Sequence, residues 1–144
     1  MIVWGGFTTG PQYVLNTGGQ YDPSMDIWTP TSSGLNVPIP RGIFTAEWTG
    51  AGMIVWGGQD VSPAAVSTGG RYDSSADFWQ TTSSGASTPS ERYLHTAIWI
   101  GNKMIIWGGS GTGGQYFYNT GGIYSSGAVV SPVNFLRGKK TASL

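Results

Sequence analysis

Short apolar runs alternate with glycine-rich turns along most of the chain. Met53-Ile-Val-Trp56 is a run of four apolar residues ended by Gly-Gly, which is typical of a short strand buried on both faces. Other blocks, built around Tyr-Asp and Asp-x-Trp, are short, aromatic and bounded by turn residues. No stretch combines a sustained helical period with caps, so the pattern predicts strands joined by tight turns and no helix.

Four of these blocks repeat along the chain. The apolar block occurs as Met1–Gly6, Met53–Gly58 and Met104–Gly109, at offsets of 52 and 51 residues. The other blocks recur as residues 17–22, 68–73 and 120–125, as residues 26–34 and 77–85, and as residues 44–50 and 95–101. All seven tryptophans fall at repeat-equivalent positions. Four strands in about 51 residues are the signature of a propeller blade.

The repeat resembles the kelch motif. The resemblance rests on the Gly-Gly doublet after an apolar strand, the Tyr-Asp pair, the spaced tryptophans and the Arg92-x-x-His95 start of a strand. The amino-acid sequence of the second repeat is similar to that of bacterial kelch-repeat proteins, and the resemblance extends over residues 1 to about 125. It implies a β-propeller but no single activity, since such propellers range from protein-binding scaffolds to galactose oxidase.

The repeats divide the chain into about three blades, at approximately residues 1–40, 41–90 and 91–135. The first repeat starts at the Gly-Gly strand and lacks the strand that should precede it. The third lacks the Asp-x-Trp strand, and we expect the apolar segment Ala128–Phe135 to replace it as an outer strand. Residues 136–144 fit no repeat and are expected to form a disordered tail.

An arc of three blades predicts a partner. Propellers close with about 4 to 8 blades, so three would leave two open faces lined by tryptophan and tyrosine. A homodimer supplies about six blades, which is a closed ring of ordinary size. The alternative is that the chain is a piece of a longer propeller.

Composition narrows the function classes. The formal net charge is +0 and charged residues make up 10% of the chain, so no nucleic-acid-binding surface is indicated. With Cys 0, disulfides, thiolate ligands and the cysteine-linked tyrosine of galactose oxidase are excluded. The first residues carry no basic region and no long apolar core, so we expect no signal peptide. No apolar run approaches the ~18 residues that span a bilayer, so no membrane contact is expected; the compartment stays open.

Candidate catalytic residues lie in the block that a kelch-like blade places nearest its axis. They are Arg41, Glu47, Arg92 and His95, which we expect to line a central channel. Glu47 departs from the repeat because its counterpart is Ile98, and His95 is the single histidine. A hydrolase would use Glu47 or His95 as a base and an arginine to stabilise an anion. The alternative for His95 is a structural hydrogen bond.

Candidate binding residues lie on or near the loops that follow the Gly-Gly doublets. These loops share length but little sequence, and variable loops on a rigid scaffold are where ligands usually bind. Aromatic and amide groups that suit a carbohydrate, a peptide or another small molecule are Tyr13, Tyr93, Gln115, Tyr116, Phe117 and Tyr118. No known metal motif is present, and we expect no metal and no cofactor. A binding module is the leading prediction; a hydrolase with its site in the channel at a dimer axis is the alternative.

Overall fold

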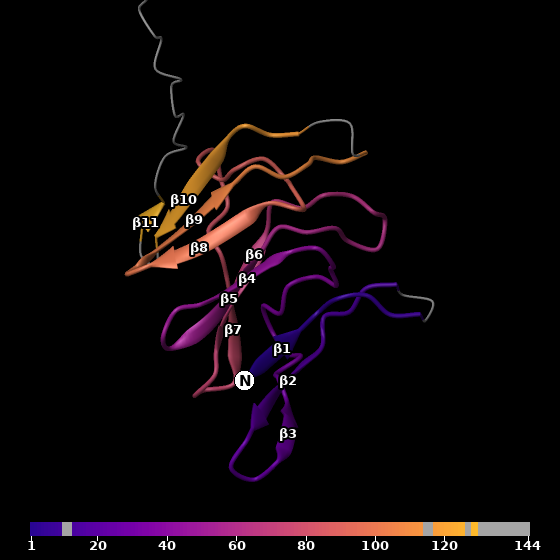
Figure 1. Ribbon diagram of the computed structural model, residues 1–144, viewed down its shortest axis with the longest axis vertical. Coiled ribbons are helices and arrows are strands. Elements are labelled where there is room, and N and C mark those ends of the chain that lie inside the picture. Colours follow the sequence, from indigo (N-terminus) through magenta and orange to yellow (C-terminus); the bar gives the residue numbers. More distant parts are fainter. Residues whose placement is uncertain (10–12, 114–116, 126–127, 130–144) are drawn as a thin grey trace, which may run out of the picture.

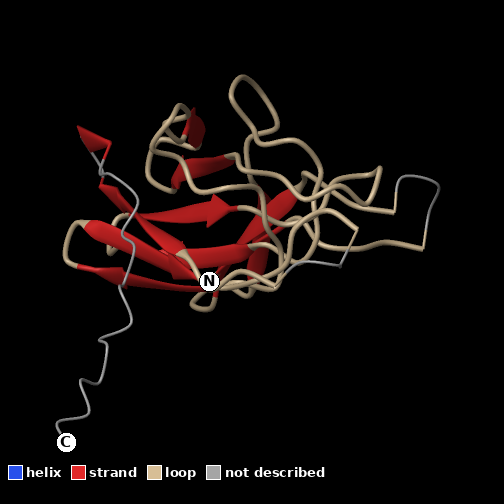
Figure 2. Ribbon diagram, turned by 90° about the horizontal axis from the view of Figure 1, so that it is seen from above, coloured by secondary structure: helices blue, strands red, loops and turns tan. Residues whose placement is uncertain are grey.

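The computed structural model describes residues 1–9, 13–113, 117–125 and 128–129. These residues contain eleven strands and no helix, so the protein is all-β, as predicted (Figure 2). The strands form three separate antiparallel sheets, one for each sequence repeat (Figure 1).

The first sheet has three strands and the other two have four each, in chain order across every sheet. The first sheet consists of β1 (Ile2–Trp4), β2 (Gly18–Asp22) and β3 (Ile27–Pro30). The second consists of β4 (Thr45–Trp48), β5 (Gly52–Trp56), β6 (Gly69–Asp73) and β7 (Phe78–Thr81). The third consists of β8 (Thr96–Ile100), β9 (Lys103–Trp107), β10 (Gly121–Ser125) and β11 (Ala128–Val129).

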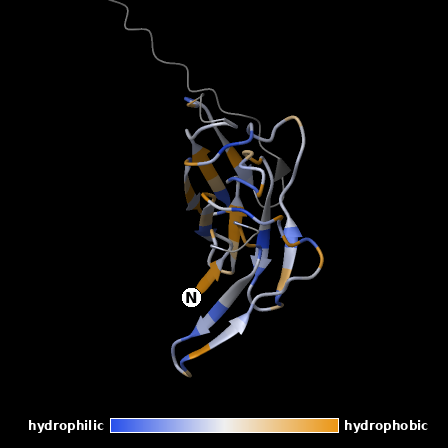
Figure 3. Cartoon of the chain, turned by 90° about the vertical axis from the view of Figure 1, so that its right-hand side faces the viewer, coloured by the Kyte–Doolittle hydropathy of each residue, from blue (hydrophilic) through white to orange (hydrophobic). Residues whose placement is uncertain are grey.

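Among the described residues, no strand pairs with the free side of β1, as the sequence predicts. In the second sheet β4 pairs with β5, and in the third β8 pairs with β9, whereas β1 is the edge of its sheet. β1 is hydrophobic (Figure 3). An unpaired strand edge presents main-chain N–H and C=O groups to whatever lies next to it.

Glycine is required opposite the repeated tryptophan of each sheet. Trp56 pairs with Gly69, and Trp4 and Trp107 pair with the equivalent glycines of their sheets. A Cβ atom on Gly69 would come within 2.2 Å of the main-chain oxygen of Val55. No side chain fits at that distance, so the strands can pair this closely only through glycine.

Aspartates close the hairpin turns of the first two sheets. Asp22 accepts a hydrogen bond from the main-chain N–H of Ser24 at 2.8 Å, and Asp73 does the same for Ser75 at 2.9 Å. Such side-chain bonds two residues ahead imitate a main-chain turn. These repeated carboxylates therefore have a structural role in the turns.

The second sheet lies between the other two and gives one face to each. One buried cluster joins Trp4 of the first sheet to Met53, Val55, Tyr72 and Trp79. The other joins Ile54 and Trp56 to Met104 and Ile106 of the third sheet. Successive residues of β5 thus face opposite neighbours, and all five of its residues are buried.

Not every tryptophan is in this core. Trp4, Trp56 and Trp79 are buried between sheets, whereas Trp28, Trp48 and Trp107 are substantially exposed. Trp28 shows the reason, because it is the repeat counterpart of Trp79 but lies on the face of the first sheet that no other sheet covers. The predicted outer strand of the third repeat is seen as β11, which pairs with β10; the rest of that segment and the predicted tail lie outside the described residues.

Candidate functional site

Arg41 is a buried arginine with its donors used inside the fold. It is 1% exposed, and its Nη1 donates to the main-chain oxygens of Gly57 at 3.0 Å and Thr68 at 2.6 Å. Nε donates to Ile39 O and Nη2 to Thr68 Oγ1. Burial lowers the pKa of Arg41 to about 10, so the side chain keeps its charge at neutral pH.

Arg92 repeats this arrangement one sheet later. Its Nη1 donates to Gly108 O and Thr120 O, both at 2.8 Å, and its Nε donates to Ser90 O. The guanidinium also lies over the ring of Tyr118, 4.5 Å from the ring centre, at cation–π distance. Burial lowers the pKa of Arg92.

The placement of these arginines differs from the expected open channel. The strands end at the Gly-Gly doublets, and there the planar guanidinium supplies several donors at once. Of the carbonyls that it holds, Thr68 O and Thr120 O also accept from the main-chain N–H groups of Gly57 and Gly108. Arg41 and Arg92 therefore join segments of chain that are distant in sequence. Their geometry gives them a structural role and leaves few donors for a bound anion.

His95 lies between the second and third sheets. Its Nε2 is 2.8 Å from Thr45 Oγ1, and its ring packs edge-on against Trp56 with 5.3 Å between ring centres. Nδ1 is buried and has no hydrogen-bond partner among the described residues. Burial, with a smaller effect of the Arg92 charge, lowers the pKa of His95 to about 4. The imidazole is therefore neutral at pH 7.

Glu47 is half-buried on β4 and borders an open hollow. The hollow has about 370 Å³ of space for water and lies beside β1. Its walls also include Met1, Ile2, Trp48 and Met53. Among the described residues no hydrogen bond or ion pair joins Glu47 to Arg41, Arg92 or His95, so the four candidates do not form one catalytic set.

The loops after β1, β5 and β9 extend from the same side of the molecule (Figure 1). Each folds back on itself through a short bridge, and the main-chain N–H of Ala65 donates to Thr112 Oγ1 at 3.1 Å, which ties the second loop to the third. Large apolar side chains are exposed on all three loops, namely Phe7, Tyr13, Val61 and Phe117. Phe7 and Val61 were not among the predicted binding residues. Their position on the variable loops was the feature of the sequence that could have identified them.

The predicted binding residues differ in how exposed their side chains are to a ligand. Tyr13 and Phe117 are exposed, whereas Tyr118 packs on Arg92 and Tyr93 is half-buried with its main chain bonded to Ser110. Gln115 and Tyr116 lie outside the described residues. Tyr13 and Phe117 are thus the predicted binding residues with the clearest access to a ligand.

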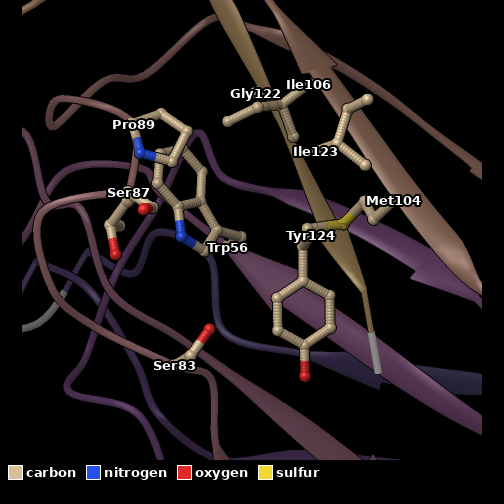
Figure 4. A pocket seen from close by; sticks show the side chains of 10 residues that line it. Trp56, Ser83, Ser87, Pro89, Met104, Ile106, Gly122, Ile123 and Tyr124 are labelled. Atoms are coloured by element: carbon tan, nitrogen blue, oxygen red, sulfur yellow. The ribbon is translucent and has the colours of Figure 1, made fainter. Parts of the chain in front are cut away.

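A second hollow, which the sequence analysis did not assign, lies between the second and third sheets (Figure 4). Its lining includes Trp56, Ser83, Pro89, Met104 and Tyr124. The absence of the Asp-x-Trp block from the third repeat was the feature of the sequence that could have indicated this hollow.

In the described part of the chain, no three His, Asp or Glu side chains come together as a metal site would require. The same residues include no helix with the length and apolar character to cross a membrane.

No family model matches the chain. The chain is similar to a probable serine/threonine-protein kinase of Dictyostelium discoideum, with 32% identity over 116 residues. The match covers 76% of this chain but only 8% of that kinase. Because it covers so small a part of the relative, the kinase activity in that protein's name is not carried over to this chain.

Proposed function

We propose that this chain is a kelch-like arc of three propeller blades that acts as a binding module. Each sheet is one blade, two copies complete a propeller of about six blades, and the ligand is held by the loops or by the central channel of that assembly. A carbohydrate or a peptide is the ligand class that exposed aromatic and amide groups on such loops suit.

The observation that carries the binding role is the set of exposed apolar side chains on three neighbouring loops. Phe7, Tyr13, Val61 and Phe117 are each more than half exposed, at 61%, 66%, 56% and 83%. Apolar side chains that gather on adjacent loops mark interaction sites more often than isolated ones do. The loops stand on rigid sheets, which is the usual arrangement for recognition.

The open faces of the end blades support assembly with a second copy. Met1, Val3 and Trp28 on the first blade are 68%, 48% and 49% exposed, whereas their repeat counterparts Met53, Val55 and Trp79 are at most 6% exposed. In the second blade these positions pack on the tryptophan face of the preceding blade. The same contact, made between the third blade of one copy and the first blade of another, would close the ring.

The binding role is tested by screening the chain against immobilised oligosaccharides and peptides. We expect the strongest ligand to bind at least about tenfold more weakly to Tyr13→Ala and Phe117→Ala, since buried aromatic contacts dominate such interfaces. Leu35→Ala is the matched control, because Leu35 is exposed but lies outside the three loops. Equal weakening by all three variants, or no ligand in the screen, would contradict the proposal.

Glu47 supports a second candidate, a hydrolase at the dimer axis. It is a half-buried carboxylate beside an open hollow, at a position where the next repeat has Ile98. A departure from repeat symmetry of this kind is a place where a site can be added to a repeated scaffold.

A further inference from the structure

The hollow between the second and third sheets occupies the place where, one repeat earlier, Trp79 is buried. Trp79 is 1% exposed and lies between Trp4 and Tyr72, with ring centres 5.2 Å and 5.0 Å away. Its indole N–H donates to the main-chain oxygen of Ser32 at 3.1 Å. An indole is thus fully accommodated between the first and second sheets.

The surroundings of Trp79 are kept in the next repeat. The residues that line the hollow are the repeat equivalents of those around Trp79. Trp56 is equivalent to Trp4, and Tyr124 to Tyr72. The other equivalent pairs are Ser83 and Ser32, Pro89 and Pro38, and Gly122 and Gly70. Figure 4 shows these side chains around the space that they enclose. Met104 and Ile106 complete an apolar wall.

The glycine under the indole is also kept. A Cβ atom on Gly19 would lie 2.9 Å from the ring of Trp28, and one on Gly70 would lie 3.0 Å from the ring of Trp79. A Cβ atom on Gly122 meets Pro89, and no indole ring is among its nearest neighbours. The third repeat therefore keeps the floor of the indole site without the indole.

The strand register explains the gap. Tyr21 pairs with Trp28 and Tyr72 pairs with Trp79, but Tyr124 pairs with Val129. Valine is smaller than tryptophan and has no N–H donor on its side chain. The repeat position that supplies an indole in the first two sheets supplies none in the third.

We propose that this pocket binds a small planar aromatic molecule that carries an N–H donor, of the indole class. The ring would lie over Gly122 against Trp56 and Tyr124, and its N–H would donate to the main-chain oxygen of Ser83. Aromatic pairs at such distances add to the free energy of apolar burial. Apolar space left by the loss of a large side chain can take up a small aromatic molecule.

The pocket is open on one side. Its free volume, with the open mouth included, is about 390 Å³. Ser87 and Thr88 in the lining carry hydroxyl groups that suit a polar substituent on the ligand. The site is separate from the three loops and does not depend on dimerisation.

Calorimetric titration of the full 144-residue chain with indole tests the site. We expect one indole per chain, and about 5- to 10-fold weaker binding of 1-methylindole, which lacks the N–H and loses one hydrogen bond. Equal affinity for the two probes would overturn the hydrogen bond to Ser83, and no binding of indole would overturn the site itself.

Variants locate the binding. Val129→Trp restores the repeat residue and should abolish indole binding while raising the melting temperature. Leu35→Trp, at an exposed position outside the pocket and the three loops, should leave indole binding unchanged. Tyr124→Leu keeps apolar bulk but removes the ring, and should weaken indole binding at least threefold even if Val129→Trp does not fold. Indole binding that survives in both pocket variants would overturn the assignment.

Discussion

The imidazole of His95 takes the place that the phenyl ring of Phe44 takes one repeat earlier. Phe44 packs edge-on against Trp4 at 5.5 Å between ring centres, and His95 packs the same way against Trp56 at 5.3 Å. One position thus accepts either an apolar ring or a neutral imidazole. What His95 adds is the contact of its Nε2 with Thr45 Oγ1.

The first prediction concerns acid stability. The pKa of His95 is lowered to about 4 in the fold, against about 6.5 in the unfolded chain. The unfolded chain therefore binds the proton more readily, and the free energy of unfolding falls as the pH falls from about 6.5 to about 4. The full effect is on the order of 3 kcal/mol. Chemical denaturation at a series of pH values measures it.

His95→Phe is the matched variant, because Phe44 shows that the site accepts a phenyl ring. We expect its stability to stay nearly flat between pH 6.5 and 4. The carboxylates whose pKa is lowered in the fold, Asp22, Asp60 and Asp73, lose their contribution mainly below this window. The same slope in both proteins would show that His95 is not the titrating group.

The second prediction concerns the buried arginines. Arg92→Lys should lower the free energy of unfolding by about 2–4 kcal/mol, because an ammonium group cannot reach Gly108 O, Thr120 O and Ser90 O together. Arg71→Lys, on β6, is the control, with an expected change within about 0.5 kcal/mol. Urea unfolding followed by circular dichroism compares them. A similar loss in both variants would contradict the structural role of Arg92.

The third prediction compares two equivalent aspartates. Asp77 Oδ1 accepts from the Tyr72 hydroxyl at 2.5 Å and, across to the first repeat, from the main-chain N–H of Ser32 at 2.7 Å. Asp26 accepts only the equivalent Tyr21 hydroxyl bond among the described residues. Asp77→Ala should therefore cost about 1–2 kcal/mol, and more than Asp26→Ala. Thermal melts of both variants decide the order.

The fourth prediction is the assembly. Native mass spectrometry at micromolar concentration should give a mass near twice 15.2 kDa. Val3→Glu, which places a carboxylate on the open face of the first sheet, should shift the chain to monomer, while Val61→Glu on a loop should not. A stable folded monomer of the unchanged chain would rule out the dimer. An open-ended series of larger masses would indicate a piece of a longer propeller.

The fifth prediction separates the binding module from the hydrolase. For a hydrolase, Glu47→Gln should reduce turnover by about 10²-fold or more while the fold is retained, as expected for loss of a general base. Activity against a broad panel of ester and glycoside substrates is the measurement, with His95→Ala as the second variant. If no activity is found, or if Glu47→Gln leaves the activity unchanged, the hydrolase hypothesis is wrong.

The fold could be predicted from the repeated blocks because their spacing and glycines carry strand length and register directly. The roles of Arg41 and Arg92 could not, because sequence alone suggests that arginine is exposed, and the carbonyls that hold it become neighbours only in the folded chain. The pocket between the second and third sheets could not be located from the sequence alone. The missing Asp-x-Trp block is visible in the sequence, but only the pairing of Tyr124 with Val129 shows which residue stands in the place of tryptophan.

The position of β5 between two packed faces has a consequence for local opening. β5 is buried along its whole length, whereas β1 is an edge strand and β3 has four exposed residues. In a repeat protein each unit is stabilised mainly by its neighbours, so a central unit opens only after one side has separated. Amide hydrogens of β5 should therefore exchange with solvent last, and the first sheet should lose its protection while the middle of the chain is still closed.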